Sequence, residues 1–170
     1  GGGGWVGGAE MGGLARAPRK PLAVLAATGS KLATAAYGQS NSLGQGGAPA
    51  LSLTQPYANV MFNGGALPGS SSTIASSNPA DYASFSPLVE EDQETMCSGA
   101  ANYARSFAAI ETGEDPNAVS YLAVSLGDGG EPIADLVKGT PHYDNVLLAR
   151  GIQGMFAIDP AYKVITVVYM

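Results

Sequence analysis

Three short apolar runs set the pattern of hydrophobic positions along the chain. They span residues 32–37, 118–126 and 163–170, and turn-forming Gly, Asn, Asp or Pro residues occur between them. Apolar runs of this length, separated by such residues, are typical of strands that are buried on both faces of a parallel sheet. The third run is rich in β-branched residues and is the strongest strand prediction in the sequence.

Helices are predicted between these strands. Apolar residues at helical spacing predict a helix over residues 94–110, with one apolar face formed by Met96, Ala100, Tyr103, Phe107 and Ile110. A second helix is predicted over residues 143–155. Helices that alternate with apolar strands imply right-handed crossovers and a parallel sheet, so the expected fold class is α/β. In such folds ligands bind at the carboxyl ends of the strands.

The stretch 45–80 is rich in Gly, Ser, Pro and Asn and carries few periodic signals. A stretch of this length in a compact domain is either a binding loop or disordered. Tyr57, Met61 and Phe62 give it apolar anchors, so an ordered loop against the functional site is the favoured interpretation. Tyr57 and Phe62 can serve equally as core-filling aromatics or as surfaces on which sugars stack.

Charge and composition exclude several classes of function. The net charge is −6, and no Lys or Arg occurs between Lys31 and Arg105. Without a basic patch, binding to a nucleic acid is not expected. No apolar run approaches the roughly 20 residues needed to span a bilayer, so no membrane partner is expected either.

Metal and disulfide chemistry are not expected. Cys97 is the only cysteine, which excludes an intramolecular disulfide and argues against a cysteine-based metal site. The acidic cluster at residues 90–94 precedes a predicted helix, where the helix dipole favours negative charge. A solvated helix start explains these carboxylates without a metal, and nothing else in the sequence implies a cofactor.

The length of 170 residues fits one domain. Residues 1–20 are glycine-rich at their start, which lacks a methionine, and are expected to be a linker or a flexible N-terminus. Residues 21–170 form the expected domain.

The strongest chemical signal is the motif Gly-Gln-Ser-Asn at residues 38–41, directly after the first predicted strand. A sharp turn at the end of a buried strand can expose a serine hydroxyl, while peptide N–H groups of the turn face an oxyanion. Ser40 is therefore the candidate nucleophile, and Gln39 and Asn41 are candidate substrate-binding residues. Gly, Ser and Asn also form ordinary loops, so the motif by itself is weak evidence.

A second turn follows the second predicted strand, where the sequence reads Gly-Asp-Gly-Gly-Glu-Pro from residue 127 to residue 132. Glycine allows the backbone to approach a tetrahedral intermediate closely, so Gly130, or alternatively Gly129, is a candidate for an oxyanion hole. Pro132 breaks the glycine spacing of a dinucleotide-binding fingerprint. A tight strand-to-helix turn with no ligand is the other interpretation.

The motif at residues 38–41 resembles the first motif of the SGNH hydrolases, in the branch of sialate O-acetylesterases and acetylxylan esterases. The turn at residues 125–133 resembles the second motif of that branch. Gln-Pro-Tyr at residues 55–57, with Asn-Gly-Gly at residues 63–65, is similar to SGNH-type proteins of phage and bacterial genomes. The resemblance covers about residues 32–170.

This resemblance implies a three-layer, flavodoxin-like parallel sheet with flanking helices, and a carbohydrate O-acyl (acetyl) esterase whose substrate is an acylated carbohydrate. In that reaction Ser40 attacks the acyl carbon, and the N–H groups of Ser40 and Gly130 hold the oxyanion. Asp128 is carried over as a substrate-binding residue.

The acid–base half of the family pattern is missing. The family's base lies in an Asp-x-x-His motif, but the only histidine, His142, has Gly139 three positions before it. His142 is therefore expected in a surface or loop role, and Asp135 and Asp144 have no expected triad role. The third family motif, Gly-Glu or Gly-x-Asn, is also absent. We expect a truncated SGNH-like domain, inactive by itself, or else a degenerate relative that keeps the fold.

The alternative function is a non-catalytic carbohydrate-binding or structural module. Glycine-rich stretches like the start of this chain also precede the terminal domains of phage tail fibres. This similarity favours a module of a phage tail or a cell-surface protein, located outside the cell or on a virion.

Overall fold

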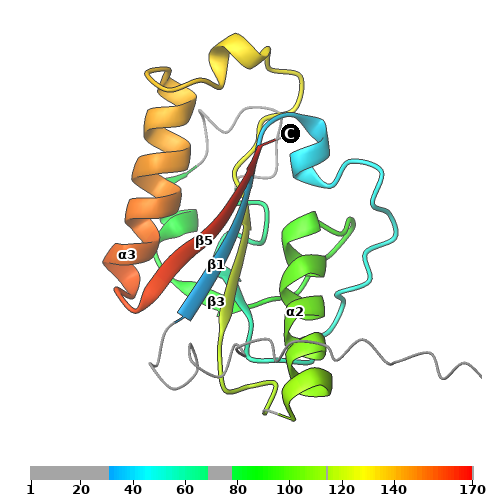
Figure 1. The fold of residues 1–170 in the computed structure, drawn as a ribbon. Coiled ribbons are helices and arrows are strands. Elements are labelled where there is room, and N and C mark those ends of the chain that lie inside the picture. The colour runs from blue at the N-terminus through cyan, green and yellow to red at the C-terminus, as the bar shows by residue number, and fades with distance from the viewer. Residues whose placement is uncertain (1–30, 69–77, 114, 170) are drawn as a thin grey trace, which may run out of the picture.

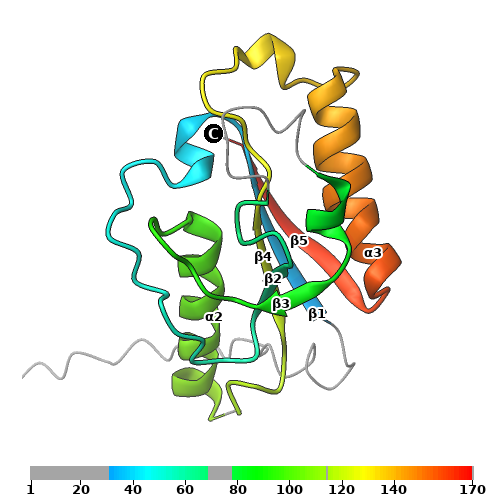
Figure 2. The ribbon, with the colours of Figure 1, turned by 180° about the vertical axis from the view of Figure 1, so that it is seen from behind.

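The computed structural model describes residues 31–68, 78–113 and 115–169. The expected glycine-rich segment, residues 1–20, lies outside the described residues. The described chain forms a five-stranded sheet with helices on both of its faces (Figures 1 and 2). The strands are β1 (Lys31–Tyr37), β2 (Val60–Phe62), β3 (Phe85–Pro87), β4 (Tyr121–Ser125) and β5 (Tyr162–Tyr169).

The strand order in the sheet is β3-β2-β4-β1-β5. β1 pairs in parallel with β4 on one side and with β5 on the other, and β2 pairs in parallel with β4. Only β3 runs antiparallel, against β2. The fold is therefore α/β with a mostly parallel, mixed sheet.

The three predicted strands are confirmed as neighbouring parallel strands. β4 is shorter than the predicted run 118–126, because residues 115–118 form a turn closed by a 2.9 Å hydrogen bond from Ala118 N–H to the Asp115 carbonyl. β2 and β3 were not predicted. Each has only three residues, which is too short to show a hydrophobic period.

The helix predicted over residues 94–110 is present as α2 (Met96–Thr112), but the face that was predicted to be apolar and buried is wrong. Tyr103 and Ile110 are 71% and 78% exposed, while Cys97 and Ala101 are fully buried. Both sets of residues have helical spacing, so periodicity alone could not choose between them. The small side chains face the sheet and let the helix axis approach it closely, which leaves the large apolar side chains outside.

The acidic cluster before α2 is only partly solvated. Glu91 and Asp92 are exposed, as expected, but Glu90 is buried. The Glu90 carboxylate accepts hydrogen bonds from Thr95 N–H at 2.9 Å and from Ser98 Oγ at 2.6 Å, so it caps the start of the helix. Glu94 is half-buried and accepts two N–H groups and a hydroxyl of the loop at residues 51–52. Neighbouring backbone, rather than water alone, satisfies these two carboxylates.

The second predicted helix, over residues 143–155, is present on the opposite face of the sheet (Figures 1 and 2). It consists of η5 (His142–Gln153), which has the wide turns of a π-helix, and runs directly into α3 (Gly154–Ile158). Three short 3₁₀ turns complete the described elements: η1 (Ser40–Leu43), η3 (Pro79–Tyr82) and η4 (Ile133–Asp135).

Alternating side chains of the central strands divide the interior into two cores. Ala33, Ala35 and Tyr37 of β1 join the core that also contains Val146, Leu147 and Met155 of the η5–α3 helix. Leu32 and Ala36 of the same strand join the core that contains Cys97 and Ala101 of α2. β1 is thus covered on both faces, as the apolar runs predicted.

The Cys97 side chain is buried, and this burial raises the pKa of its thiol to about 12. The thiol is therefore protonated near neutral pH, and only thiolate is nucleophilic. We expect Ellman's reagent to leave Cys97 unmodified in the folded protein and to modify it completely in urea. Rapid stoichiometric modification of the folded protein would contradict this burial.

Lys31 and Asp159 form an ion pair of 2.5 Å at the start of β1 and just before β5. The hydrogen bond from Lys31 lowers the pKa of Asp159, so this pair stabilises the fold above the usual Asp pKa and less so as pH falls below it. Both side chains are partly exposed, which limits the effect to about 0.5 kcal/mol. We expect Asp159→Asn to reduce the pH dependence of the free energy of unfolding, measured in urea, between about pH 5 and pH 3. Asp135→Asn, a change at an exposed position of η4, serves as the control and should leave that slope unchanged.

Candidate functional site

The candidate site lies where β1, β4 and β2 end. β4 is bonded to one side of β1 and β5 to the other. The connection from β1 to β4 includes α2, whereas the connection from β4 to β5 runs through η5 and α3 on the opposite face. The two connections therefore cross opposite faces of the sheet, and in parallel α/β sheets ligands bind at the carboxyl ends of the strands. The turns of both predicted motifs are located there (Figure 1).

The first turn follows β1 directly. Gly38 has a φ of +147°, a conformation that favours glycine, and Ser40 begins η1 two residues later. Ser40 is half-buried and Asn41 is exposed. The other serine of the turn, Ser42, is fully buried, and its hydroxyl donates to the Gln39 carbonyl at 2.6 Å. Of these two serines, Ser40 is the more exposed.

The second turn packs directly on the first. Asp128 N–H donates to the Gly38 carbonyl at 2.8 Å, and the Gln39 side-chain amide donates to the Glu131 carbonyl. The Ser125 hydroxyl donates to the Ser42 carbonyl, which joins the end of β4 to η1. The two motif turns, which are more than 80 residues apart in the sequence, thus lie in contact.

Gly127 is the glycine that permits this contact. A Cβ at Gly127 would lie 1.8 Å from Ser42 Oγ and 2.7 Å from the Gly38 carbonyl oxygen. Gly130, in contrast, is exposed with open space around it, and its φ of +86° is what favours glycine there. A Cβ at Gly129 would meet the side chains of Gln45 and Leu43 at 3.1 and 3.2 Å. The sequence prediction concerned the approach of Gly130, or Gly129, to an oxyanion, and it did not include this packing role of Gly127.

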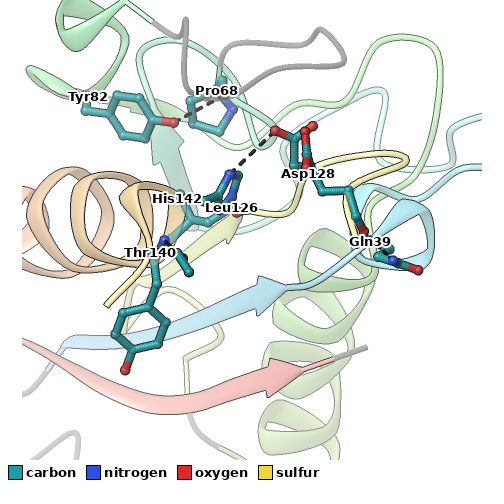
Figure 3. Close-up of polar contacts among 9 residues, drawn as sticks. Gln39, Pro68, Tyr82, Leu126, Asp128, Thr140 and His142 are labelled. Atoms are coloured by element: carbon teal, nitrogen blue, oxygen red, sulfur yellow. Dashed lines mark hydrogen bonds and ion pairs between the residues drawn. The ribbon is translucent and has the colours of Figure 1, made fainter. Parts of the chain in front are cut away.

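His142 is buried, so its expected surface role is wrong. Its Nε2 lies 3.2 Å from the Leu126 carbonyl oxygen, and its Nδ1 lies 3.5 Å from Asp128 Oδ2 (Figure 3). The ring also packs against Tyr37, with 5.5 Å between the ring centroids. His142 lies four residues before the buried Val146, on the same helical face, which is the signal in the sequence that could have indicated its burial.

The carboxylate predicted to bind substrate is also in the interior. Asp128 is 2% exposed, and its side chain points toward His142 (Figure 3). Both ring nitrogens of His142 therefore face groups other than Ser40. Asp135, on η4, and Asp144, in the first turn of η5, are both exposed.

A pocket of about 610 Å³ opens beside the second turn. Its walls come from the turn after β4, the segment after β1, the loop after β2 and the segment that leads to α2. The lining residues are Leu43, Gln45, Met61, Asn63, Gly64, Gly65, Ala66, Leu67, Val89, Glu90, Glu91, Asp92, Gln93, Thr95, Gly127 and Gly129. A volume of this size is typical of small-molecule sites.

The loop predicted to lie against the site does so between Met61 and Leu67, which line this pocket. Phe62 is fully buried against Tyr82 and Phe85, so it fills the core rather than stacking on a ligand. Asn41 lines a second, shallower hollow of about 590 Å³, and Gln45 borders both.

Comparison of the chain with protein-family models, with curated proteins and with solved structures finds no match in any of the three. Within the described ranges, no three His, Cys, Asp or Glu side chains are grouped so that they could hold a metal ion. No helix of the described residues is long and apolar enough to cross a membrane. The two turns and the pocket are therefore the features of the molecule that bear on its function.

Gly127→Ala tests whether the two turns depend on their close contact. The new methyl group would overlap the Ser42 hydroxyl, and we expect a loss of about 3 kcal/mol in the free energy of unfolding, measured in urea. Gly130→Ala is the matched control: its surroundings are open, and only its positive φ opposes a side chain, at a cost of about 1 kcal/mol. A smaller loss for Gly127→Ala than for Gly130→Ala would contradict the described packing.

Proposed function

We propose that this chain carries the nucleophile and oxyanion half of an SGNH-type carbohydrate O-acyl esterase, built on a three-layer, flavodoxin-like sheet. The observation that carries the proposal is the position of Ser40. It begins η1 at the carboxyl end of the central strand β1, in a turn that packs on the glycine turn after β4. The order of β4, β1 and β5, with helices on both faces, is compatible with that architecture.

In the proposed reaction the Ser40 hydroxyl oxygen attacks the acyl carbon of an acetylated sugar and loses its proton to a base. The peptide N–H groups of Ser40 and Gly130, or Gly129, donate to the oxyanion that forms. The Ser40 N–H is at the beginning of η1, where a helix has no acceptor of its own for this group. Collapse of the tetrahedral intermediate expels the sugar hydroxyl and leaves acetyl-Ser40.

The proton acceptor is the open part of this proposal. His142 is the only histidine in the sequence, and its ring nitrogens face the Leu126 carbonyl and the Asp128 carboxylate. No described residue forms a hydrogen bond with the Ser40 hydroxyl. Without a base, a serine triad loses on the order of 10⁶ in turnover, so we propose that this chain alone hydrolyses esters very slowly.

The same observation favours the second candidate, a carbohydrate-binding module that does no chemistry. In such a module the pocket beside Gly127 holds a sugar, and Ser40 acts as a hydrogen-bond donor at its edge. The two candidates share one site and differ in whether Ser40 becomes acylated.

Acylation of Ser40 by p-nitrophenyl acetate separates the two candidates. At about pH 9 hydroxide replaces the missing base, and the acetyl group should accumulate because acetyl-Ser40 is an alkyl ester, which hydroxide hydrolyses more slowly than the activated p-nitrophenyl ester. We expect peptide mapping by mass spectrometry to find acetyl on Ser40 at least about tenfold faster than on the exposed Ser84, since the oxyanion donors act only at Ser40. Ser40→Ala should abolish this product.

Ser42→Ala is the matched control for that experiment, because the Ser42 hydroxyl lies in the same turn but is buried. In the Ser42→Ala variant, the rate of Ser40 acetylation should stay within about twofold of the wild-type rate, provided that circular dichroism shows an intact fold. His142→Gln should do the same. If Ser40 reacts no faster than Ser84, the binding module is the better description; if His142→Gln removes the reaction, then His142 is the base.

A further inference from the structure

Resting on the proposed function, we infer that the pocket of about 610 Å³ is the sugar subsite, and that it selects an uncharged sugar over an acidic one. Gly127 and Gly129 line the pocket and belong to the same turn as the proposed oxyanion donor Gly130. A sugar held there would lie next to the turn that bears Ser40. The pocket is the more enclosed of the two hollows that border Gln45.

Glu90 is the fixed polar group of this pocket. The residue lines the pocket although it is only 7% exposed. One carboxylate oxygen, Oε1, accepts hydrogen bonds from Thr95 and Ser98, which hold the group in place. The other oxygen, Oε2, accepts no hydrogen bond from the described residues. A carboxylate oxygen that is left over at a residue lining the pocket suits a hydroxyl of a bound sugar, and such a charge-assisted bond is strong.

The charges around the pocket explain its selectivity. Glu91 and Asp92 line it beside Glu90, and none of the described residues that line it is Lys, Arg or His. An acidic sugar would place its carboxylate among three like charges with no cation to compensate them. An uncharged sugar meets no such repulsion.

The remaining walls of the pocket fit a neutral sugar. Gln45 and Gln93 carry exposed side-chain amides, which both donate and accept hydrogen bonds, whereas the Asn63 amide is already bonded to the backbone of residues 80–84. Leu43, Met61 and Leu67 are half-buried and present apolar surface between these groups. This mixture of apolar walls with a few polar groups is the usual composition of small-molecule sites.

Binding of two matched trisaccharides tests this inference. The Ser40→Ala chain is titrated by NMR with acetylated xylotriose, which is neutral, and with acetylated trigalacturonate, which is acidic. We expect at least about tenfold tighter binding of the neutral sugar at low salt, and a smaller ratio in about 0.5 M salt, because screening weakens the repulsion.

Glu90→Gln should weaken the binding of acetylated xylotriose by about tenfold, because a charge-assisted hydrogen bond is replaced by a neutral one. Glu111→Gln makes the same chemical change near the far end of α2, about 20 Å from Thr95, and should change neither affinity. If Glu90→Gln fails to fold, Glu91→Gln/Asp92→Asn alters only exposed carboxylates and should raise the affinity for trigalacturonate.

Equal affinity for the two sugars, or tighter binding of the acidic one, overturns the inference. So does an equal effect of Glu90→Gln and Glu111→Gln. The outcome is independent of the esterase proposal, because binding is measured without Ser40. Selective binding without acetylation of Ser40 in the wild-type chain supports the subsite and overturns the esterase. Acetylation of Ser40 with unselective binding supports the esterase and overturns the subsite.

Discussion

The contact between the turn after β1 and the turn after β4 is the constraint on which the candidate site depends. Gly127 lies so close to the Ser42 hydroxyl and the Gly38 carbonyl that no side chain fits between them. Because the turns touch, Asp128 N–H can bond to the Gly38 carbonyl and the Gln39 side chain can reach Glu131. The position of Ser40 relative to the glycines of the second turn follows from this packing rather than from either motif alone.

Small residues make the same kind of close approach possible inside the fold. β1 is rich in alanine, and α2 presents Cys97 and Ala101 to the sheet, so helix and sheet approach without large side chains between them. The larger apolar residues of α2 therefore remain outside, where Tyr103 stacks on Phe107 with 6.1 Å between the ring centroids. Close helix packing at the sheet and exposed aromatics on the helix are thus two results of one sequence pattern.

The sequence predicted the elements better than their faces. Apolar runs identified β1, β4 and β5, because strands that are buried on both faces consist mainly of apolar residues. The face of α2 was predicted wrongly since two sets of residues share the helical period, and only tertiary packing chooses between them. His142 and Glu90 were expected at the surface, but their partners at Leu126, Asp128, Thr95 and Ser98 bury them. Such partners depend on the fold, and for His142 the helical spacing from the buried Val146 is the local signal that could have indicated its burial.

The pairing of His142 with Asp128 bears on both candidate functions. It ties the start of η5 to the turn after β4, and so to the wall of the pocket (Figure 3). A histidine engaged in this way supports the shape of the site but cannot accept a proton from Ser40 without leaving its partners. A serine with oxyanion donors and no base still forms hydrogen bonds to a sugar. What distinguishes an esterase from a binding module on this scaffold is therefore a single proton acceptor within hydrogen-bonding reach of Ser40.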